Sequence, residues 1–322
     1  MESSLTERVR GACEAVAKRA TRVRINHERL PYYAASLRLV QATAPQLDPE
    51  RHYFGGPDDT VAFFLALDTI NFGSGYFPHL GKRPGMSGYF TVAASLTDYY
   101  RQHGPLPARE LAELSAEDCT KIFSQDPDNE PIRELMGLFA AALNDLGRYL
   151  LDRFGGSFTG LLEEAGSYAE RLARALREMP FFDDVEPYDG LEVPFYKRAQ
   201  LTPADLALAF EGKGPGRFED LDRLTIFADN LVPHVLRVDG ILLYEEDLAA
   251  RIDAKEPIPP GSAEEVEIRA CAVHAVEQLV GEFRELGRED VTAMGLDYLL
   301  WNRGQQPYYK ARPRHRTRSV FY

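Results

Sequence analysis

Residues 130–153, EPIRELMGLFAAALNDLGRYLLDR, are the stretch of this 322-residue chain that most strongly indicates its fold. Apolar side chains recur along it every three or four positions, which is the period of one buried helix face. Gly155 and Gly156 follow directly and are typical of a helix end. The stretch therefore predicts one long helix whose buried face is made by Ile132, Leu135, Leu138, Phe139, Ala142, Leu143 and Leu146.

The same helical period recurs on both sides of this stretch, whereas strand signals are few. Strands are predicted only for residues 193–196 and, from partial alternation, for residues 312–322. No long Gly-, Ser- or Pro-rich linker divides the chain. The sequence thus predicts a mainly α protein with a small β ribbon of two or three strands, in a single domain over residues 1–322. Further helices are predicted after a Thr6 cap, after Asp58 and Asp59, after Ser115 with Asp118, over residues 167–178, from Thr202-Pro203 and after Ser262 with Glu265.

The charge of the chain narrows the class of function. Lys and Arg number 37 against 50 Asp and Glu, a formal net charge of −13. Such a surface repels the phosphate backbone of a polynucleotide, so no nucleic-acid polymer is expected as a partner. Residues 298–322 differ, because they contain no acidic residue and several arginines. This basic segment is either a solvated tail or a place for one small anion.

Cysteine and histidine patterns exclude further classes. The three cysteines form no CxxC pair and the seven histidines are scattered, so neither a disulfide framework nor a metal site is predicted. This usage favours a reducing cytoplasm. No uncharged apolar run reaches the length of a membrane span, and residues 1–20 lack an apolar signal core. We therefore expect a cytoplasmic protein with no membrane partner.

Three charged residues fall in apolar surroundings and are candidates for function. Arg269 lies on the apolar stripe of the helix after Ser262, where Glu265, four residues earlier, is its local partner; a structural buried ion pair is the alternative. Asp297 shares a helix face with aromatic residues and either caps a neighbour or recognises a ligand donor. Asp229 precedes the helix break at Pro233, so it is either an N-cap or a poised, partly desolvated carboxylate.

Several blocks of sequence, in this order along the chain, resemble the queuosine salvage protein family. They are SGYF (residues 87–90), RFGGSF (153–158), PFYKRAQ (194–200), EGKGPGRFED with LTIFADNLVP (211–220 and 224–233), GSAEEVEIRA (261–270) and LDYLLW (296–301). The resemblance runs from about residue 60 to the C-terminus. It implies a mainly helical single domain, similar in its helical arrangement to DNA glycosylases. It also implies a hydrolase without cofactor or metal that cleaves the N-glycosidic bond of queuosine 5′-phosphate and releases queuine.

The resemblance also assigns residues. Asp229 matches the aspartate of the FAD motif, the catalytic carboxylate. The departures from the family pattern are Asn230 with Leu231, His234 and Asn302, and contacts at these positions are not carried over. Asn71 and Phe72 match the Asn-Phe pair that follows the first conserved helix of the family. With them, the substrate-binding residues that the resemblance implies are Ser87, Tyr89, Lys197, Arg198, Phe227, Glu267, Arg269, Asp297 and Trp301, with the C-terminal Tyr322 added.

The chemistry of the reaction explains these residue types. Cleaving a nucleoside bond builds an oxocarbenium-like positive charge, which a fixed carboxylate such as Asp229 stabilises. Activation of the attacking water and a transient bond to C1′ stay open as further roles of Asp229. A 7-deazaguanine base has no N7 to protonate, so the pocket must hold its pyrimidine edge, through Asp297 or Glu267, and stack its ring, on Phe227, Tyr89 or Trp301.

The 5′-phosphate needs a separate cation. If Lys197 and Arg198 lie on a strand, only one of them faces the site, and Lys197 is preferred, with a tail arginine or the Tyr322 hydroxyl as helper.

Two other functions stay open at this point. One is a base-excision type of glycosylase acting on a polynucleotide, and the other is a non-catalytic protein that binds a 7-deazaguanine nucleotide. Salt-dependent binding of DNA or tRNA distinguishes the first. Ligand binding without any product distinguishes the second. The sequence leaves the oligomeric state undetermined, with a monomer as the working expectation.

Overall fold

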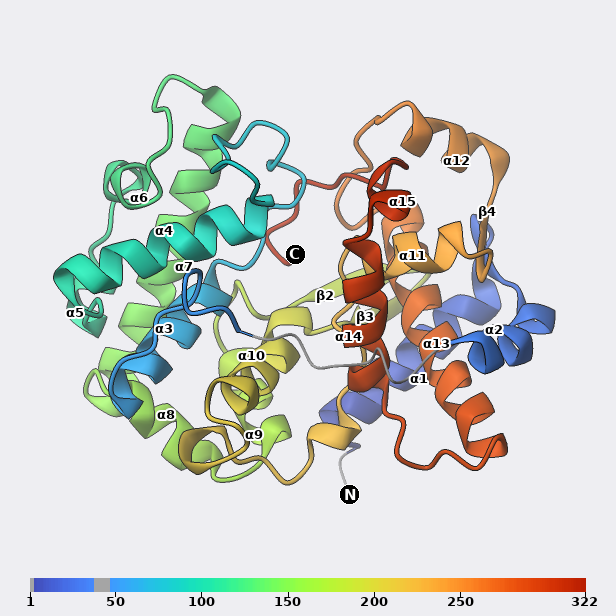
Figure 1. Ribbon diagram of the computed structural model, residues 1–322, viewed down its shortest axis with the longest axis horizontal. Helices are drawn as coiled ribbons and strands as arrows, with labels where there is room; N and C mark the ends of the chain where they lie inside the picture. The colour runs from blue at the N-terminus through green and yellow to red at the C-terminus, as the bar shows by residue number, and fades with distance from the viewer. Residues whose placement is uncertain (1–2, 38–46) are drawn as a thin grey trace. The chain divides into compact units, whose positions relative to one another are not determined.

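The computed structural model describes residues 3–37 and 47–322 and is mainly helical (Figure 1). Among the described residues, strands form only two antiparallel pairs, β1 with β4 and β2 with β3. The predicted fold class, mainly α with a small ribbon, is therefore confirmed. In the described part of the chain no helix is long and apolar enough to cross a membrane.

The chain forms two compact units, each built from separated segments. The ribbon unit comprises Met1–Pro45, Asp184–Lys197 and Asp220–Arg318, and it contains both strand pairs. The helical unit comprises Gln46–Asp183, Arg198–Glu219 and Ser319–Tyr322. The prediction of one domain over residues 1–322 is not tested by this division and stays a prediction.

The helical unit is centred on α7 (Glu130–Phe154), the helix that the opening stretch predicts. Its predicted apolar face is buried except for Leu138, which is half-buried. The helix ends at Gly155, whose φ of 59° is left-handed, a conformation that glycine adopts without strain. At Gly147 a side chain would meet backbone atoms of residues 108 and 112, so the lack of a side chain lets α5 approach α7 closely. The other elements of this unit are α3 (Pro57–Thr69), α4 (Gly88–His103), α5 (Ala108–Leu111), α6 (Ala116–Ile122), α8 (Phe158–Ala165), α9 (Ala169–Leu176), α10 (Lys197–Ala209, beyond its first residue) and the 3-10 turn η3 (Gly214–Gly216).

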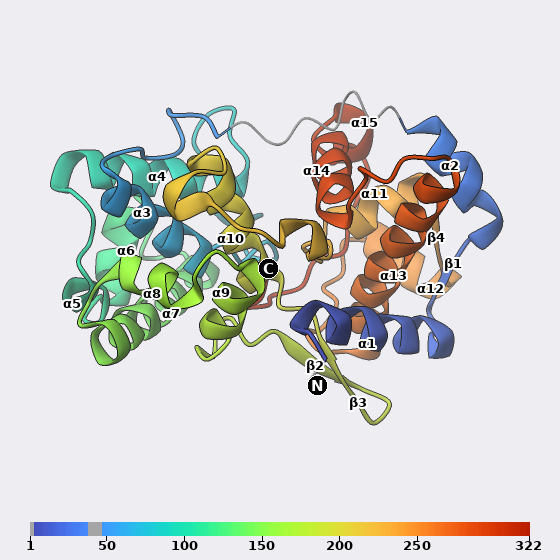
Figure 2. The ribbon, with the colours of Figure 1, turned by 90° about the horizontal axis from the view of Figure 1, so that it is seen from below.

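The ribbon unit is built around α13 (Ala263–Glu285), capped by Ser262 as predicted. The β2–β3 ribbon lies beside α1 (Figure 2) and turns at Asp189 and Gly190, both with positive φ, as in a two-residue hairpin loop. The elements of this unit are α1 (Leu5–Arg19), β1 (Val23–Ile25), η1 (His27–Arg29), α2 (Leu30–Ser36), β2 (Val185–Tyr188), β3 (Leu191–Pro194), η4 (Leu221–Arg223), α11 (Val232–Val238), β4 (Leu242–Tyr244), α12 (Glu246–Asp253), α13, α14 (Ala293–Gly304) and α15 (Pro307–Lys310).

Some predicted helix starts are confirmed, and three are wrong. The helix predicted after Asp58 and Asp59 begins before them, at Pro57, so that both lie in the first turn of α3. Ser115 forms the predicted capping box with Asp118. In α1 the cap is Ser4, which forms a capping box with Glu7, and not Thr6, which is buried in the first turn. The helix predicted from Thr202 begins five residues earlier, at Lys197, so that Pro203 lies inside it.

The strand predictions fare less well. The predicted strand 193–196 overlaps only the end of β3, and the chain turns into α10 after it. Residues 312–322 do not form a strand of a ribbon, because their only β pairing in the described chain is an isolated bridge between Arg316 and Pro257. Their alternation reflects side chains that are buried and exposed in turn without a neighbouring strand.

Candidate active site

Asp229 lies in the segment between η4 and α11, with one carboxylate oxygen anchored and the other unbonded. Its Oδ1 atom accepts the backbone N–H groups of Leu231, at 2.7 Å, and Val232, at 3.2 Å. Pro233 follows in the first turn of α11, where its missing N–H costs nothing. Among the described residues nothing donates a hydrogen bond to Oδ2. The N-cap of α11 is Leu231, so the alternative that Asp229 is the N-cap is wrong. The carboxylate binds the backbone at the start of this helix and is a partly exposed, fixed negative charge.

The basic C-terminal segment passes close to this carboxylate through Arg314. Burial lowers the pKa of the Arg314 guanidinium, and the negative charge of Asp229 opposes that shift. The Asn230 side-chain amide donates to the carbonyl of His315, at 3.3 Å, and so ties this segment to the residue after Asp229. Arg312 and Arg318 are exposed. Arg314 is therefore a tail arginine of the ribbon unit whose charge interacts with that of Asp229.

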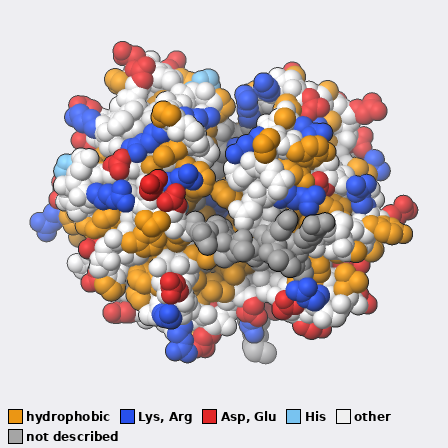
Figure 3. Space-filling model, in the orientation of Figure 1, with side chains coloured by type: hydrophobic (Ala, Val, Ile, Leu, Met, Phe, Trp, Pro, Cys, Tyr) orange, Lys and Arg blue, Asp and Glu red, His pale blue; other side chains and the backbone are white. Residues whose placement is uncertain are grey.

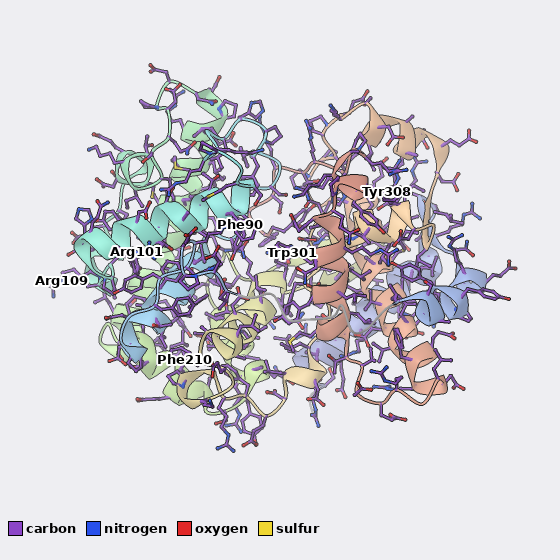
Figure 4. The ribbon with its side chains drawn as sticks, viewed as in Figure 1. Phe90, Arg101, Arg109, Phe210, Trp301 and Tyr308 are labelled. Atoms are coloured by element: carbon purple, nitrogen blue, oxygen red, sulfur yellow. The ribbon has the colours of Figure 1, made fainter. Side chains whose placement is uncertain are left out.

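Asp297 on α14 fixes the chain two residues before Asp229. It is buried, and its Oδ1 accepts the Phe227 N–H at 2.9 Å. The Phe227 ring lies 6.2 Å from that of Tyr298 on the same helix. Asp297 thus holds the backbone of a neighbouring segment, and its predicted contact with a ligand stays a prediction. Trp301 is half-buried and projects from α14 on the side away from α13 (Figure 4).

Arg269 is fully buried and forms an ion pair. Its main partner in this pair was not predicted from the sequence. Its guanidinium bonds the carboxylate of Asp184, at 2.6 and 3.1 Å, whereas the predicted partner Glu265 lies at 3.5 Å. It also donates from Nε to the carbonyl of Ala228, at 3.0 Å. Arg269 therefore contacts the residue before Asp229 through the backbone.

Glu186 on β2 lies close to this cluster and titrates near neutrality. Burial, and then the negative charge of Glu265, raise its pKa from 4.5 to about 7, against the opposing charge of Arg269. The pKa of this carboxyl is higher in the folded protein than in the unfolded chain. Above the pKa of the unfolded chain, the unfolded state therefore loses the proton first, and the folded state becomes less stable relative to it. The penalty grows from about pH 4.5 and is complete above about pH 7.

We therefore expect Glu186→Gln to raise the melting temperature more at about pH 8 than at about pH 5. Thermal unfolding at both pH values measures this difference. The matched control is Glu192→Gln, an exposed carboxylate on the paired strand β3. An equal gain for Glu186→Gln at both pH values would contradict the prediction.

Glu267, a predicted acceptor for the base, accepts hydrogen bonds from residues 21–23. Its buried carboxylate accepts the backbone N–H groups of Thr21, Arg22 and Val23, at 3.2, 2.6 and 2.9 Å, and the Tyr188 hydroxyl at 2.8 Å. These donors join α13 to the segment between α1 and β1. The arrangement favours a structural role for Glu267 over the predicted contact with the base.

From the sequence, Lys197 and Arg198 were considered as residues of a strand. In the structure they lie in the first turn of α10. Tyr196 before them has a φ of 48°, which is unfavourable for a residue with a side chain, so the turn into the helix is held in place by its surroundings. Arg198 is buried and donates to the carbonyls of Asp68, Thr69, Phe181 and Val320, all in the helical unit.

The remaining predicted residues lie in the helical unit, several of them around the end of α3. Phe72 stacks on Phe181 and carries the Arg198 guanidinium over its ring, at 4.8 Å. The backbone oxygen of the C-terminal Tyr322 accepts the N–H of Gly73 at 3.0 Å. Tyr322 therefore lies close to the segment that contains Asn71 and Phe72. The predicted contacts of this group with a substrate stay predictions.

Ser87 and Tyr89 begin α4. Ser87 is its N-cap, accepting the N–H of Phe90, and the Tyr89 hydroxyl lies 3.3 Å from His52 Nε2. Burial raises the pKa of Tyr89, and the charges of Asp205 and Asp68 add to this. Asp68, whose charge acts on Tyr89, is a residue that the sequence analysis did not name as a candidate. A carboxylate within the apolar stripe of α3 was the signal that could have identified Asp68.

The surface of each unit mixes charges of both signs. On the face shown in Figure 3, acidic and basic side chains are interspersed, without a continuous basic area. Among the described residues no group of His, Cys, Asp and Glu side chains is arranged to hold a metal ion. The groups that the structure places at Asp229 are two backbone N–H groups and the charge of Arg314.

Fold and site together define a mainly helical protein with a fixed carboxylate at a helix start. The chain belongs to the queuosine salvage protein family, whose model matches residues 51–322. It is 36% identical over 312 residues, 95% of both chains, to the queuosine 5′-phosphate N-glycosylase/hydrolase of Sphaerobacter thermophilus. The protein of the same name from Mus musculus is 30% identical, over 97% of this chain and 98% of its own. That from Dictyostelium discoideum is 32% identical, over 82% and 78%.

Proposed function

We propose that this protein hydrolyses the N-glycosidic bond of queuosine 5′-phosphate, with Asp229 as the catalytic carboxylate. Membership of the family and the names of the relatives support the substrate and the reaction. The observation that supports Asp229 is its geometry, with Oδ1 held by two backbone N–H groups and Oδ2 unbonded within the described chain. A carboxylate held in this way needs little rearrangement to face a developing positive charge.

The reaction breaks the bond between C1′ of the ribose and the base nitrogen. The bonding electrons leave with the base, which gains a proton and becomes queuine, while water supplies the hydroxyl group at C1′. In the transition state positive charge develops on C1′ and the ring oxygen. The negative charge of Asp229 stabilises that state more than the neutral ground state, which is the condition for a gain in kcat.

We assign the 5′-phosphate to Lys197. The guanidinium of Arg198 is directed at backbone carbonyls, which supports the choice of its neighbour. Lys197 opens α10, and its backbone N–H is bonded to Asp184 Oδ2 at 3.2 Å, so the position of this residue is fixed. Arg314, close to Asp229, is the helper that the tail provides. A cation at a non-reacting group supplies binding energy for orienting the bond to be cleaved.

Turnover of queuosine 5′-phosphate, followed by mass spectrometry of released queuine, tests the function and the phosphate site together. We expect the unaltered protein to release queuine, and Lys197→Met to lower kcat/KM for queuosine 5′-phosphate by roughly 10- to 100-fold, since a charge-assisted hydrogen bond contributes about 1.5–3 kcal/mol. The variant should lose little activity on unphosphorylated queuosine.

The control variant is Lys213→Met, an exposed lysine near the end of α10, which should leave both reactions unchanged. Release of queuine only from tRNA or an oligonucleotide, with none from the free nucleotide, would contradict the proposed substrate. An equal loss of Lys197→Met activity on both free substrates would contradict the phosphate assignment.

A reducing, cytoplasmic location is part of the proposal. Cys13, Cys119 and Cys271 are free and buried in the structure. Burial raises the pKa of each thiol, so they persist as unreactive thiols in the interior. Such usage is typical of proteins that fold in a reducing compartment.

A further inference from the structure

We propose that Asp184 and Arg269 are positioning residues, which together hold the catalytic carboxylate Asp229 and the phosphate-binding Lys197 in one arrangement. The inference rests on the proposed function, since it takes the roles of Asp229 and Lys197 from it. All four residues belong to the ribbon unit.

Asp184 fixes the segment that leads into Lys197 with both its side chain and its backbone. Its Oδ2 accepts the Lys197 N–H at 3.2 Å. Its backbone carbonyl accepts the N–H of Phe195 at 2.9 Å and of Tyr196 at 3.3 Å. These bonds act on the residues around the left-handed Tyr196, whose conformation needs support from its neighbours. Asp184 is itself buried and lies directly before strand β2, so its own position is well determined.

Arg269 links Asp184 to the residue before Asp229 by hydrogen bonds. Its two terminal nitrogens bond both oxygens of Asp184, at 3.1 and 2.6 Å, while Nε donates to the Ala228 carbonyl at 3.0 Å. The guanidinium lies 3.9 Å from the centre of the Phe195 ring, which restricts its plane. A planar group with donors on two edges can make these bonds simultaneously, and an ammonium group cannot.

The result is one continuous path of hydrogen bonds. It runs from the Lys197 N–H through Asp184 and Arg269 to the Ala228 carbonyl, and the next residue in the chain is Asp229. Because the side chain of Arg269 is 0% exposed and that of Asp184 2%, water cannot replace either partner at little cost. Catalysis depends on position, and a displacement of about 1 Å can reduce the rate by about 100-fold. Loss of either partner should therefore disturb both Asp229 and Lys197.

Two changes in kinetics follow for Asp184→Asn. We expect kcat on queuosine 5′-phosphate to fall by about 100-fold, because Asp229 is displaced. We also expect the preference for queuosine 5′-phosphate over queuosine, expressed as the ratio of kcat/KM values, to fall by about tenfold, because Lys197 moves. Both are measured per folded molecule, with folding checked by circular dichroism.

Arg269→Lys is the second variant, which keeps the buried positive charge for Asp184 but cannot bond Asp184 and Ala228 together. Its kcat and its substrate preference should fall as in Asp184→Asn. In the double variant the losses should not add, because residues that act as a unit fail together.

The control is Asp239→Asn, which removes a half-buried, paired charge in the same unit. Asp239 accepts the hydroxyls of Tyr33 and Tyr309, at 2.5 and 2.8 Å, and pairs with Arg303. It should lower the melting temperature without changing kcat or the substrate preference. If Asp184→Asn and Arg269→Lys behave like this control in a protein whose unaltered form releases queuine, the positioning role is wrong and the proposed function stands. If the unaltered protein releases no queuine, the proposed function fails and the positioning role fails with it.

Discussion

Replacing Asp229 with asparagine is expected to lower kcat for queuine release by about 1,000-fold while leaving substrate binding almost unchanged. Removal of a single preorganised electrostatic group from an active site costs about 100- to 1,000-fold. The charge is lost, but the amide oxygen of asparagine can still accept the N–H groups of Leu231 and Val232 that Oδ1 accepts now. The start of α11 should therefore keep these hydrogen bonds and its structure.

Single-turnover kinetics measure the loss, and calorimetric titration with queuosine 5′-phosphate measures the binding. The matched control is Asp222→Asn, an exposed carboxylate in η4 of the same unit, which should turn over at the unaltered rate. A rate for Asp229→Asn within about tenfold of the unaltered protein would contradict the catalytic assignment, given the size expected for such a group.

Replacing Arg198 with methionine is expected to destabilise the protein by at least about 4 kcal/mol, since four carbonyls lose this donor and each loss costs about 1–3 kcal/mol. The guanidinium bonds the carbonyls of Asp68 and Thr69 at the end of α3, and also those of Phe181 and Val320. It is also stacked over Phe72, so methionine keeps some packing but none of the hydrogen bonds. Unfolding in urea, followed by circular dichroism, measures the change.

Arg171→Met is the matched control, because Arg171 is an exposed arginine stacked on Tyr168 in the same unit. Its free energy of unfolding should stay within about 0.5 kcal/mol of the unaltered value. A similarly small change for Arg198→Met, together with a large rise in KM for queuosine 5′-phosphate, would move the phosphate site from Lys197 to Arg198.

The local elements were predictable because their signals are local. The apolar period of residues 130–153 and the following glycines correspond to α7 and its end, and Ser262 caps α13 as expected. The hairpin between β2 and β3 also had a local signal, the pair Asp189-Gly190, which is typical of a two-residue turn. The predicted strands rested on other signals, which were apolar and aromatic residues at 193–196, overlapping only the end of β3, and partial alternation at 312–322.

The start of α10 shows why boundaries were harder. Pro203 was assigned to a first turn, where proline is favourable, but the helix begins at Lys197 and includes it. The Thr202 hydroxyl donates to the Arg198 carbonyl at 3.0 Å and so takes part in the bonding of this turn. Contacts of Arg198 with residues distant in the sequence support the start of the helix at this point. Rules based on neighbouring residues cannot predict such contacts.

The sequence by itself determined the fold class, the family and the presence of a carboxylate at the break before Pro233, since these depend on residue types and short spacings. It also indicated that Arg269 must be paired. Only the tertiary structure decided with which residue, because Asp184 lies 85 positions away in the chain. The same holds for Arg198, whose partner carbonyl at Val320 is 122 positions away. A buried charge requires a partner, and that requirement can be read from the sequence; the partner's identity depends on how distant segments pack.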